Sequence, residues 1–194
     1  MLLPEEKMWL GSLVPYPSRN YPKPQSDKQE WRLRDKEDFF QNWWRSQKIS
    51  SVFFDGASKG NPGAAGAGGV IYSPDDYSKD IFYWGLGQKS NNQAELLGLL
   101  KACQIARDKG VKNLQVFGDS ELIIKNVNMG DRFNNPSLNK TLERLKRVLQ
   151  YFDSCKFYHI LRKLNSEADQ MANKGSALMK GLIFVNKESF VQMP

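Results

Sequence analysis

The sequence of 194 residues predicts an α/β fold with a five-stranded mixed sheet and helices on both of its faces. Three strand-like segments follow one another between residues 51 and 84 with only turns between them, which indicates antiparallel pairing. Two further strand-like segments alternate with helical segments, which indicates strands that run parallel. Hydrophobic residues make up 40% of the chain, enough for a packed core.

Turn residues separate the first three segments. Residues 51–55, SVFFD, are expected to form a buried strand that ends in a carboxylate, and a turn follows at residues 61–63. The glycine-rich segment 64–72 is expected to be the second strand, and its missing side chains indicate close approach of another backbone. The third strand is predicted at residues 81–84, IFYW.

The later elements alternate. Apolar residues at helical spacing predict a long helix over residues 93–108, which ends before Gly110. The fourth and fifth strands are predicted at residues 114–117 and 156–161. Three more helices are predicted: at 120–127, at 136–149 after the N-cap Asn135, and at 166–173, where Ser166 and Asp169 have the spacing of a capping box.

Composition changes near residue 50. The first fifty residues contain four of the five tryptophans and five of the nine prolines, but one of the 15 glycines. The prolines predict extended backbone at residues 15–24, and the acids at 35–38 predict the start of a short helix that ends at Trp44. We therefore expect three parts: a Pro/Trp-rich extension at 1–50, a main domain at 51–175 and a C-terminal tail at 176–194.

Two interpretations of the extension remain open. Aromatic and basic side chains of this kind can stack on bases and bind phosphate. Alternatively, the tryptophans attach the extension to the main domain through aromatic burial, which is the interpretation that we favour. The residues concerned are Trp31, Arg32, Arg34, Trp43, Trp44 and Arg45.

Charge and hydropathy restrict the function classes. The 28 basic residues outnumber the 21 acidic ones by seven, which favours polyanionic partners such as nucleic acids, although net charge also serves solubility. No apolar segment approaches the about 18 residues of a membrane-spanning helix, and the first residues lack a signal-peptide pattern. We expect an intracellular protein that is not secreted and has no membrane association, with Cys103 and Cys155 reduced and buried.

Four carboxylates lie where strands end or helices begin. Asp55 ends the most apolar strand, Asp119 ends the fourth strand, and Glu95 and Asp169 lie in the first turns of two helices. Because the carboxyl ends of strands in such sheets meet at one rim, these acids would repel one another and favour a divalent cation. Acids are also common at helix starts, so each has a purely structural explanation as well. Asp55 fits that explanation least, because a charge after a buried strand needs a partner.

The segments around these acids resemble type 1 ribonuclease H. The resemblance covers about residues 51–175 and lies in four motifs in family order: FFDGASKGNPGAAGAGGVI (53–71), SNNQAE (90–95), GDS (118–120) and HILRKLNSEADQMAN (159–173). The first motif is most similar to the modules of plants and their retroelements. The resemblance implies a ribonuclease H-like fold and endonucleolytic hydrolysis of the RNA strand of an RNA–DNA hybrid, with 5′-phosphate and 3′-hydroxyl ends.

The resemblance also implies roles for individual residues. Asp55, Glu95, Asp119 and Asp169 match the ligands of two Mg²⁺ ions, for which Mn²⁺ can substitute. His159 matches a histidine that assists proton transfer or product release. The expected partner is an RNA–DNA hybrid, bound by a monomer. The implied substrate contacts are Gly56, Asn61, Ser90, Asn91, Asn92, Ser120 and Asn165.

Two features depart from the family pattern. His159 follows strand residues instead of lying in a glycine-rich loop, which leaves open a surface histidine without a catalytic role. The basic helix–loop insert with which some members hold substrate is absent. Basic residues of the following helix either replace it in part or form a solvated face: Lys140, Arg144, Lys146 and Arg147.

Two other functions stay open. One is a catalytically idle module of a retroelement protein that binds or tethers nucleic acid, against which the presence of all four acids argues. The other is a different metal-dependent nuclease or transposase of the same superfamily. The turn at residues 60–63, GNPG, and the segment SNNQAE favour ribonuclease H over that alternative.

Overall fold

The computed structural model describes residues 37–75 and 78–188, and the extended backbone predicted at residues 15–24 lies outside this part of the chain. Its strands are β1 (Ser50–Gly60), β2 (Gly63–Tyr72), β3 (Lys79–Lys89), β4 (Asn113–Gly118), β5 (Ser154–His159) and β6 (Ile183–Glu188). Its helices are α1 (Glu37–Ser46), α2 (Asn91–Asp108), α3 (Glu121–Met129), α4 (Pro136–Leu149) and α5 (Ser166–Ser176), with a short 3-10 helix at Arg162–Leu164.

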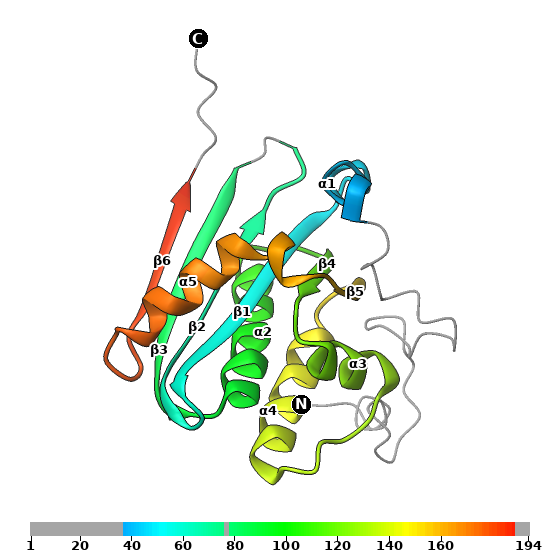
Figure 1. Ribbon diagram of the computed structural model, residues 1–194. Coiled ribbons are helices and arrows are strands. Elements are labelled where there is room, and N and C mark those ends of the chain that lie inside the picture. The colour runs from blue at the N-terminus through cyan, green and yellow to red at the C-terminus, as the bar shows by residue number, and fades with distance from the viewer. Residues whose placement is uncertain (1–36, 76–77, 189–194) are drawn as a thin grey trace.

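All six strands form one sheet in the order β5-β4-β1-β2-β3-β6 (Figure 1). β1, β2 and β3 pair antiparallel, whereas β4 is parallel to both β1 and β5. The predicted mixed sheet is therefore confirmed. Because β1, β4 and β5 run in the same direction, their carboxyl ends point to the same rim.

The sixth strand corrects the prediction of five. β6 lies in the segment that we expected to be a tail, and it pairs antiparallel with β3. The rings of Tyr83 and Phe184 stack across this pair with their centroids 4.8 Å apart. Ile183, Phe184 and Val185 are nevertheless 40–49% exposed, because β6 is an edge strand. A short apolar segment with this exposure does not stand out in the sequence as a core strand.

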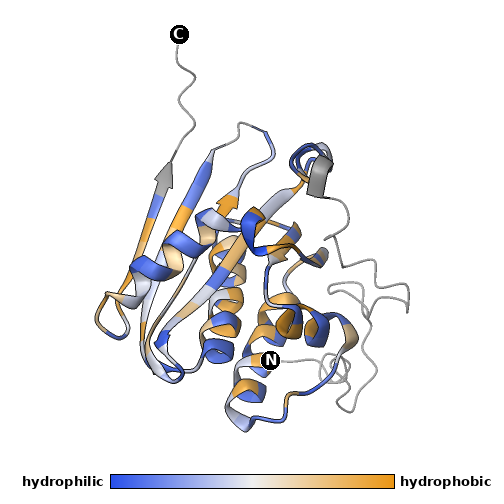
Figure 2. Cartoon of the chain, viewed as in Figure 1, coloured by the Kyte–Doolittle hydropathy of each residue, from blue (hydrophilic) through white to orange (hydrophobic). Residues whose placement is uncertain are grey.

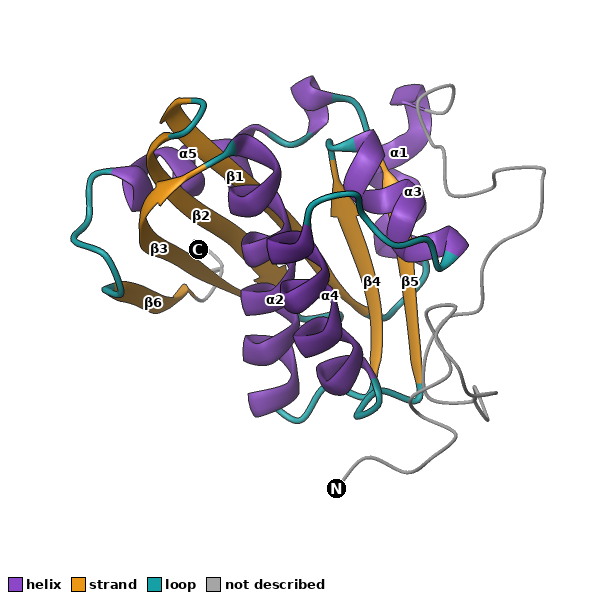
Figure 3. Cartoon of the chain, turned by 90° about the horizontal axis from the view of Figure 1, so that it is seen from below, coloured by secondary structure: helices purple, strands orange, loops and turns teal. Residues whose placement is uncertain are grey.

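Helices cover both faces of the sheet (Figure 3). On one face, α2, α3 and α4 enclose the main core, which contains Phe54, Leu99 and Leu145. On the other face, α5 packs against β1, β2 and β3. Figure 2 shows hydrophobic and hydrophilic residues alternating along α2 and α4, as expected for helices with one buried side.

Helix α1 attaches the end of the predicted extension to the same face as α5. Trp44 is 5% exposed and packs edge-on against Phe53, with ring centroids 5.2 Å apart. Trp43 packs in the same way against Tyr158 at 5.3 Å. The side-chain amide of Gln115 donates to the main-chain oxygen of Trp44 at 2.7 Å. These contacts support packing over base stacking as the role of the two tryptophans.

Two helix starts differ from the prediction. α2 begins at Asn91 because Ser90 caps it: its Oγ accepts from the Gln93 N–H at 3.2 Å, and Gln93 Oε1 accepts from the Ser90 N–H at 2.8 Å. Glu95 therefore lies in the second turn of α2 and not in the first. The predicted capping box of Ser166 and Asp169 is wrong, since Asn165 holds the N-cap position of α5 without a side-chain cap.

The basic face predicted on α4 is corrected at one position. Lys140, Arg144 and Arg147 are exposed, but Lys146 is buried at 1% exposure. It follows Leu145 on the side of the helix that meets the core. Burial lowers the pKa of the Lys146 ammonium group. The side chains available to an external partner on α4 are therefore the other three.

Candidate active site

Three carboxylates meet at the rim where β1 and β4 separate. Asp55 lies on β1, Asp119 directly follows β4, and Glu95 comes from α2. One ligand oxygen of each lies within 4.8 Å of those of the other two. β1 does not end at Asp55 as predicted, because its antiparallel pairing with β2 continues to Gly60. The parallel pairing with β4 stops at Phe53, which opens one side of Asp55 to the other acids.

Glycine at position 56 brings Glu95 to the strand. A Cβ atom at Gly56 would lie 2.2 Å from the main-chain carbon of Ala94 and 2.3 Å from the nitrogen of Glu95. No side chain fits into this contact, so α2 packs directly on the backbone of β1. Gly56, which we expected to contact substrate, thus has a structural role at this position.

Asp169, on α5, is not one of the three clustered acids, but it lies near enough to Asp55 and Asp119 to raise the pKa of both. This helix lies against the glycine-rich strand β2, where a Cβ atom at Gly68 would lie 2.4 Å from the main-chain carbon of Met171. Gly68 is the partner of Asp55 in the β1–β2 pair, so the close approach places α5 beside Asp55. The close backbone contact predicted for this strand is confirmed.

Burial and mutual repulsion make the cluster hard to ionise. Asp55 is 3% and Glu95 is 9% exposed. Burial raises the pKa of Asp55 to about 7, and the charge of Asp119 adds to this rise. Burial, followed by the charge of Asp55, raises the pKa of Glu95 well above its ordinary value. Burial also raises the pKa of Asp119, and the charge of Asp169 contributes.

Asn165 holds Asp119 in place from within the protein. Its side-chain amide donates to Asp119 Oδ2 at 3.1 Å and to the main-chain oxygen of Phe54 at 2.9 Å. The residue is 1% exposed. The hydrogen bond from Asn165 and the positive charge of Arg162 both lower the pKa of Asp119, against the effect of burial. We expected Asn165 among the substrate contacts, whereas its amide group is directed to the protein.

His159 ends β5 beside the cluster. Its Nε2 lies 3.2 Å from the main-chain oxygen of Asp119, and the residue is 5% exposed. The alternative of a surface histidine therefore does not hold. A catalytic role for this ring stays a prediction.

The other predicted substrate contacts fall into two groups. Asn61, Asn91 and Asn92 are exposed, and Asn61 Oδ1 accepts from the Asn91 N–H at 3.0 Å, which joins the β1–β2 turn to the start of α2. Ser90 and Ser120 use their hydroxyl groups as N-caps of α2 and α3. The three asparagines therefore offer side chains at the surface, while the two serines mainly position helices.

The donor set fits a divalent metal ion. It consists of carboxylate oxygens, the ligands that Mg²⁺ and Mn²⁺ prefer. Glu95 Oε2 is buried and has no hydrogen-bond partner among the described residues. An acceptor of this kind is unfavourable without a partner, and a cation between Asp55, Glu95 and Asp119 would supply one.

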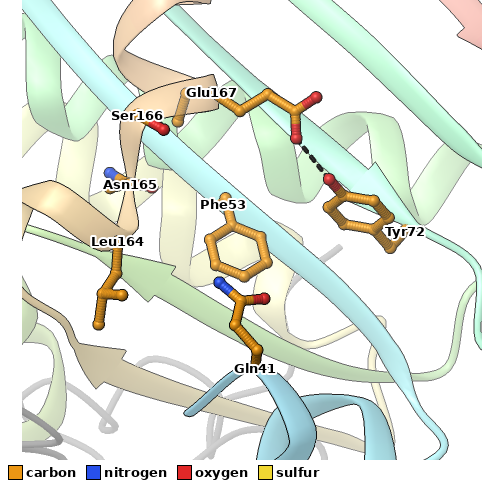
Figure 4. A pocket seen from close by; sticks show the side chains of 8 residues that line it. Gln41, Phe53, Tyr72, Leu164, Asn165, Ser166 and Glu167 are labelled. Atoms are coloured by element: carbon orange, nitrogen blue, oxygen red, sulfur yellow. Dashed lines mark hydrogen bonds between the residues drawn. The ribbon is translucent and has the colours of Figure 1, made fainter. Parts of the chain in front are cut away.

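Apart from the carboxylate cluster, a hollow of about 130 Å³ lies where α1 meets the start of α5 (Figure 4). Phe53, Leu164 and Gln41 form part of its lining. At its side the hydroxyl of Tyr72 donates to Glu167, which also pairs with Lys79. No sequence motif predicted this hollow, because its lining comes from the extension and from four separate elements of the main domain: β1, β2, the 3-10 helix and α5.

Comparison with known proteins identifies the family. The sequence profile of the family described as reverse transcriptase-like matches residues 53–175. Ribonuclease HI of Halobacterium salinarum is 36% identical over 123 residues, which are 63% of this chain and 62% of the relative. The crystal structure of RNase H1 from Halobacterium salinarum has a TM-score of 0.62 at 35% identity and covers 66% of this chain and 96% of that one. LC11-RNase H1, solved in complex with an RNA/DNA hybrid, has a TM-score of 0.60 at 26% identity and covers 64% of this chain and 94% of that one.

The profile match covers more than half of the chain and includes all four acids of the site. The chain spans 62% of the length of the Halobacterium relative, so the match concerns this domain and not that whole protein. The domain also has the mixed sheet and two helix layers of the matched RNase H1 structures. The chain therefore belongs to the reverse transcriptase-like family and, within it, to the type 1 ribonucleases H that its motifs resemble.

Proposed function

We propose that this chain is an endonuclease that hydrolyses the RNA strand of RNA–DNA hybrids with two divalent metal ions, leaving 5′-phosphate and 3′-hydroxyl ends. The observation that carries the proposal is the meeting of Asp55, Glu95 and Asp119 within 4.8 Å, with Asp169 close enough to raise the pKa of Asp119. Mg²⁺ is the proposed cofactor, and Mn²⁺ would substitute for it. The hybrid bound to LC11-RNase H1 supports the choice of substrate class.

The four carboxylates would hold the ions. The chemistry that two ions would supply there is activation of a water molecule and stabilisation of the departing 3′ oxygen during displacement at phosphorus. Asn165 fixes the orientation of Asp119 through its amide, which keeps one ligand oxygen directed to the cluster. Arg162 favours the ionised form of Asp119, the form that a metal ligand needs.

The remaining predicted residues serve the substrate. The exposed side chains of Asn61, Asn91 and Asn92 can bind the sugar and phosphate groups of a strand that lies over the rim. Recognition of RNA requires contacts to 2′-hydroxyl groups across a minor groove, for which small polar loops are suited. His159, next to Asp119, would assist proton transfer or product release. We propose that the chain acts as a monomer, since each site residue comes from the same chain.

The test is incubation of the full chain with end-labelled RNA–DNA hybrid, duplex DNA and duplex RNA, with Mg²⁺ and with chelator. We expect cleavage of RNA in the hybrid alone, dependent on Mg²⁺, with 5′-phosphate at the new ends. Asp55→Asn should abolish cleavage, and Asp153→Asn, which removes an exposed acid far from the rim, should not. Hybrid binding without any cleavage by the unaltered chain would instead establish the idle binding module.

A further inference from the structure

Strand β6 exposes a cluster of hydrophobic side chains at one edge of the sheet (Figure 1). Within the described part of the chain six large hydrophobic side chains are exposed, and five of them lie between residues 179 and 185. They are Met179, Leu182, Ile183, Phe184 and Val185, of which Met179 is the most exposed at 74%. We call these five residues the β6 edge surface. Apolar side chains gathered in this way on a protein surface are typical of an interaction site.

The main chain of β6 is paired on one side only. The Gly85 N–H donates to the main-chain oxygen of Leu182 at 2.8 Å, which sets the hydrogen-bonding pattern between β3 and β6. Because bonded and non-bonded pairs alternate in antiparallel strands, Phe184 then directs its main-chain groups to β3 as well. Ile183 and Val185 direct their N–H and C=O groups to the other side, where no described strand follows β6. The free edge therefore offers donors and acceptors to a further strand.

The hydrophobic side chains of β6 lie on both faces of the sheet. Phe184 lies on the face of α5, since its ring stacks on that of Tyr83, and Lys174 of α5 has its Nζ 5.8 Å from the centroid of the Tyr83 ring. Ile183 and Val185 alternate with Phe184 and therefore lie on the opposite face. Of the described elements, only β3 makes extensive contact with β6. A strand added at this edge would continue both faces and bury these side chains.

The other edge of the sheet has the protection that β6 lacks. Edge strands of folded proteins are ordinarily protected from pairing by charged side chains or by segments that cover them. β5 exposes Lys156, and Trp43 of α1 packs against Tyr158 of the same strand. The exposed apolar residues of β6, from Ile183 to Val185, include no charged residue and no proline. The free edge of β6 is therefore suited to receive a strand.

The charge around the β6 edge surface favours an acidic partner. Residues 170–186, which lead from α5 into β6, contain the two cations Lys174 and Lys180 and no acid. Both lysines are exposed, and neither forms an ion pair with a described residue. Asp80 of the neighbouring strand is buried and pairs with Lys109, so its charge is already compensated. Two copies of this chain placed edge to edge would bring these cations together, which disfavours a second copy as the occupant.

We propose that the β6 edge surface binds an extended segment of a partner protein, which adds to the sheet as a further strand. Its main chain pairs with Ile183 and Val185, its apolar side chains cover both faces of the edge, and its acidic side chains meet Lys174 and Lys180. Recognition of this kind takes its affinity from main-chain hydrogen bonds and its specificity from alternate side chains. The proposal does not depend on the proposed cleavage, because β6 carries none of the site acids and lies three strands away from β1.

A synthetic strand tests the main-chain contacts. The probe is a blocked, fluorescently labelled peptide of about six alternating valine and threonine residues, the common length of a strand, with a glutamate at each end. Fluorescence anisotropy gives its dissociation constant for the full chain and for Val185→Pro. The proline removes an N–H at the free edge and leaves the bonds of Phe184 to β3, so binding should weaken about tenfold or more. Val185→Thr, which keeps the N–H and the shape of the side chain, is the matched control and should bind nearly as well as the unaltered chain.

The charges are tested with the same probe. Lys174→Gln/Lys180→Gln should weaken binding by up to about fivefold for each lysine, the range of exposed ion pairs. Lys112→Gln/Lys156→Gln removes the same charge from exposed positions toward the other edge of the sheet and should leave binding unchanged. A peptide with lysine in place of both glutamates should bind the unaltered chain more weakly than the acidic peptide.

Amide hydrogen exchange locates the contact on the full chain. In the free protein the Phe184 N–H should exchange slowly, because it is directed to β3, whereas those of Ile183 and Val185 should exchange fast. Saturating peptide should slow exchange at Ile183 and Val185 and change that of Phe184 little. Melting temperatures close to that of the unaltered chain show which variants are folded, and the exchange pattern tests the proposal without any substitution.

The outcomes distinguish the possible occupants. Undiminished binding by folded Val185→Pro, or no binding of either peptide together with unchanged exchange, overturns the proposal. Slow exchange at Ile183 and Val185 in the free, monomeric chain also overturns it, since another segment of the same chain then occupies the edge. A dimer that forms with rising concentration and is abolished by Val185→Pro would make a second copy the occupant. Equal binding of the lysine and glutamate peptides overturns the acidic character of the partner.

Discussion

Replacing Asp55 with asparagine should stabilise the metal-free protein while it abolishes cleavage. In the folded protein, burial raises the pKa of Asp55 from its ordinary value of 3.8 to about 7. Between these two values the folded state binds more protons than the unfolded state, so the free energy of unfolding falls as pH rises through this window. The substituted asparagine would carry no charge, and its amide oxygen can still accept the hydrogen bond that the Gly56 N–H donates to Asp55 Oδ1 at 2.9 Å.

The size of the effect follows from the two pKa values. At 1.36 kcal/mol per pH unit, the difference between 3.8 and about 7 corresponds to about 4 kcal/mol at pH 7. At pH 5, where the folded-state carboxyl is largely protonated, the same linkage gives about 2 kcal/mol. For a chain of this size, 1 kcal/mol changes the melting temperature by about 2–4 °C. We therefore expect Asp55→Asn to melt about 8–16 °C higher than the unaltered chain in chelator at pH 7, and about 4–8 °C higher at pH 5.

The assay is thermal unfolding in chelator at pH 5, 6, 7 and 8, repeated with Mg²⁺. Mg²⁺ should raise the melting temperature of the unaltered chain more than that of Asp55→Asn, because binding to the folded state stabilises it. Asp153→Asn, which replaces an exposed acid, serves as control and should follow the unaltered chain. If Asp55→Asn melts at or below the temperature of the unaltered chain in chelator at pH 7, the repulsion inferred for this cluster is wrong.

Three further substitutions test other parts of the site. His159→Ala should slow hybrid cleavage by at most about 10²–10⁴-fold, and a loss as complete as that of Asp55→Asn would show a ligand or structural role instead. Asn165→Ala removes a hydrogen bond that lowers the pKa of Asp119, so the acid limb of the pH–rate profile should move to higher pH; an unmoved limb would contradict this. Trp44→Ala should destabilise the protein by about 3–5 kcal/mol, and the slope of log hybrid affinity against log salt concentration should not change. A smaller slope at unchanged stability would instead assign Trp44 to substrate binding.

The site acids could be predicted because their sequence positions are informative. Asp55 interrupts an apolar strand, and Asp119 stands between a buried strand and a helix N-cap. Strand direction then determines that both reach one rim. The arrangement of strands β1 to β5 could also be predicted from the sequence, because hydrophobic periodicity and turn residues define these elements locally.

Other features depend on contacts that no local pattern shows. β6 is half exposed at the sheet edge, so its apolar residues do not mark a core strand. Ser166 has the sequence of a cap, but Asn165 precedes α5 and its amide is used by Asp119 and by Phe54. A hollow between α2 and α4 is lined by residues of β3, α2 and α4 that are up to 55 positions apart, from Lys89 to Arg144. Each of these results from tertiary packing, which a single sequence does not specify residue by residue.

The packing that assembles the acids also prevents them from moving apart. Gly56 lies against the backbone of α2, and Gly68 lies against the backbone of α5, so main-chain contacts fix the elements that carry Glu95 and Asp169. A carboxylate displaced to reduce repulsion would have to break these contacts, which belong to a close-packed interior. The repulsion is therefore retained in the folded protein, and a bound cation is the favourable means of neutralising it. Metal affinity and the reduced stability of the metal-free protein arise from the same contacts, so a substitution that separates either helix from the sheet should diminish both.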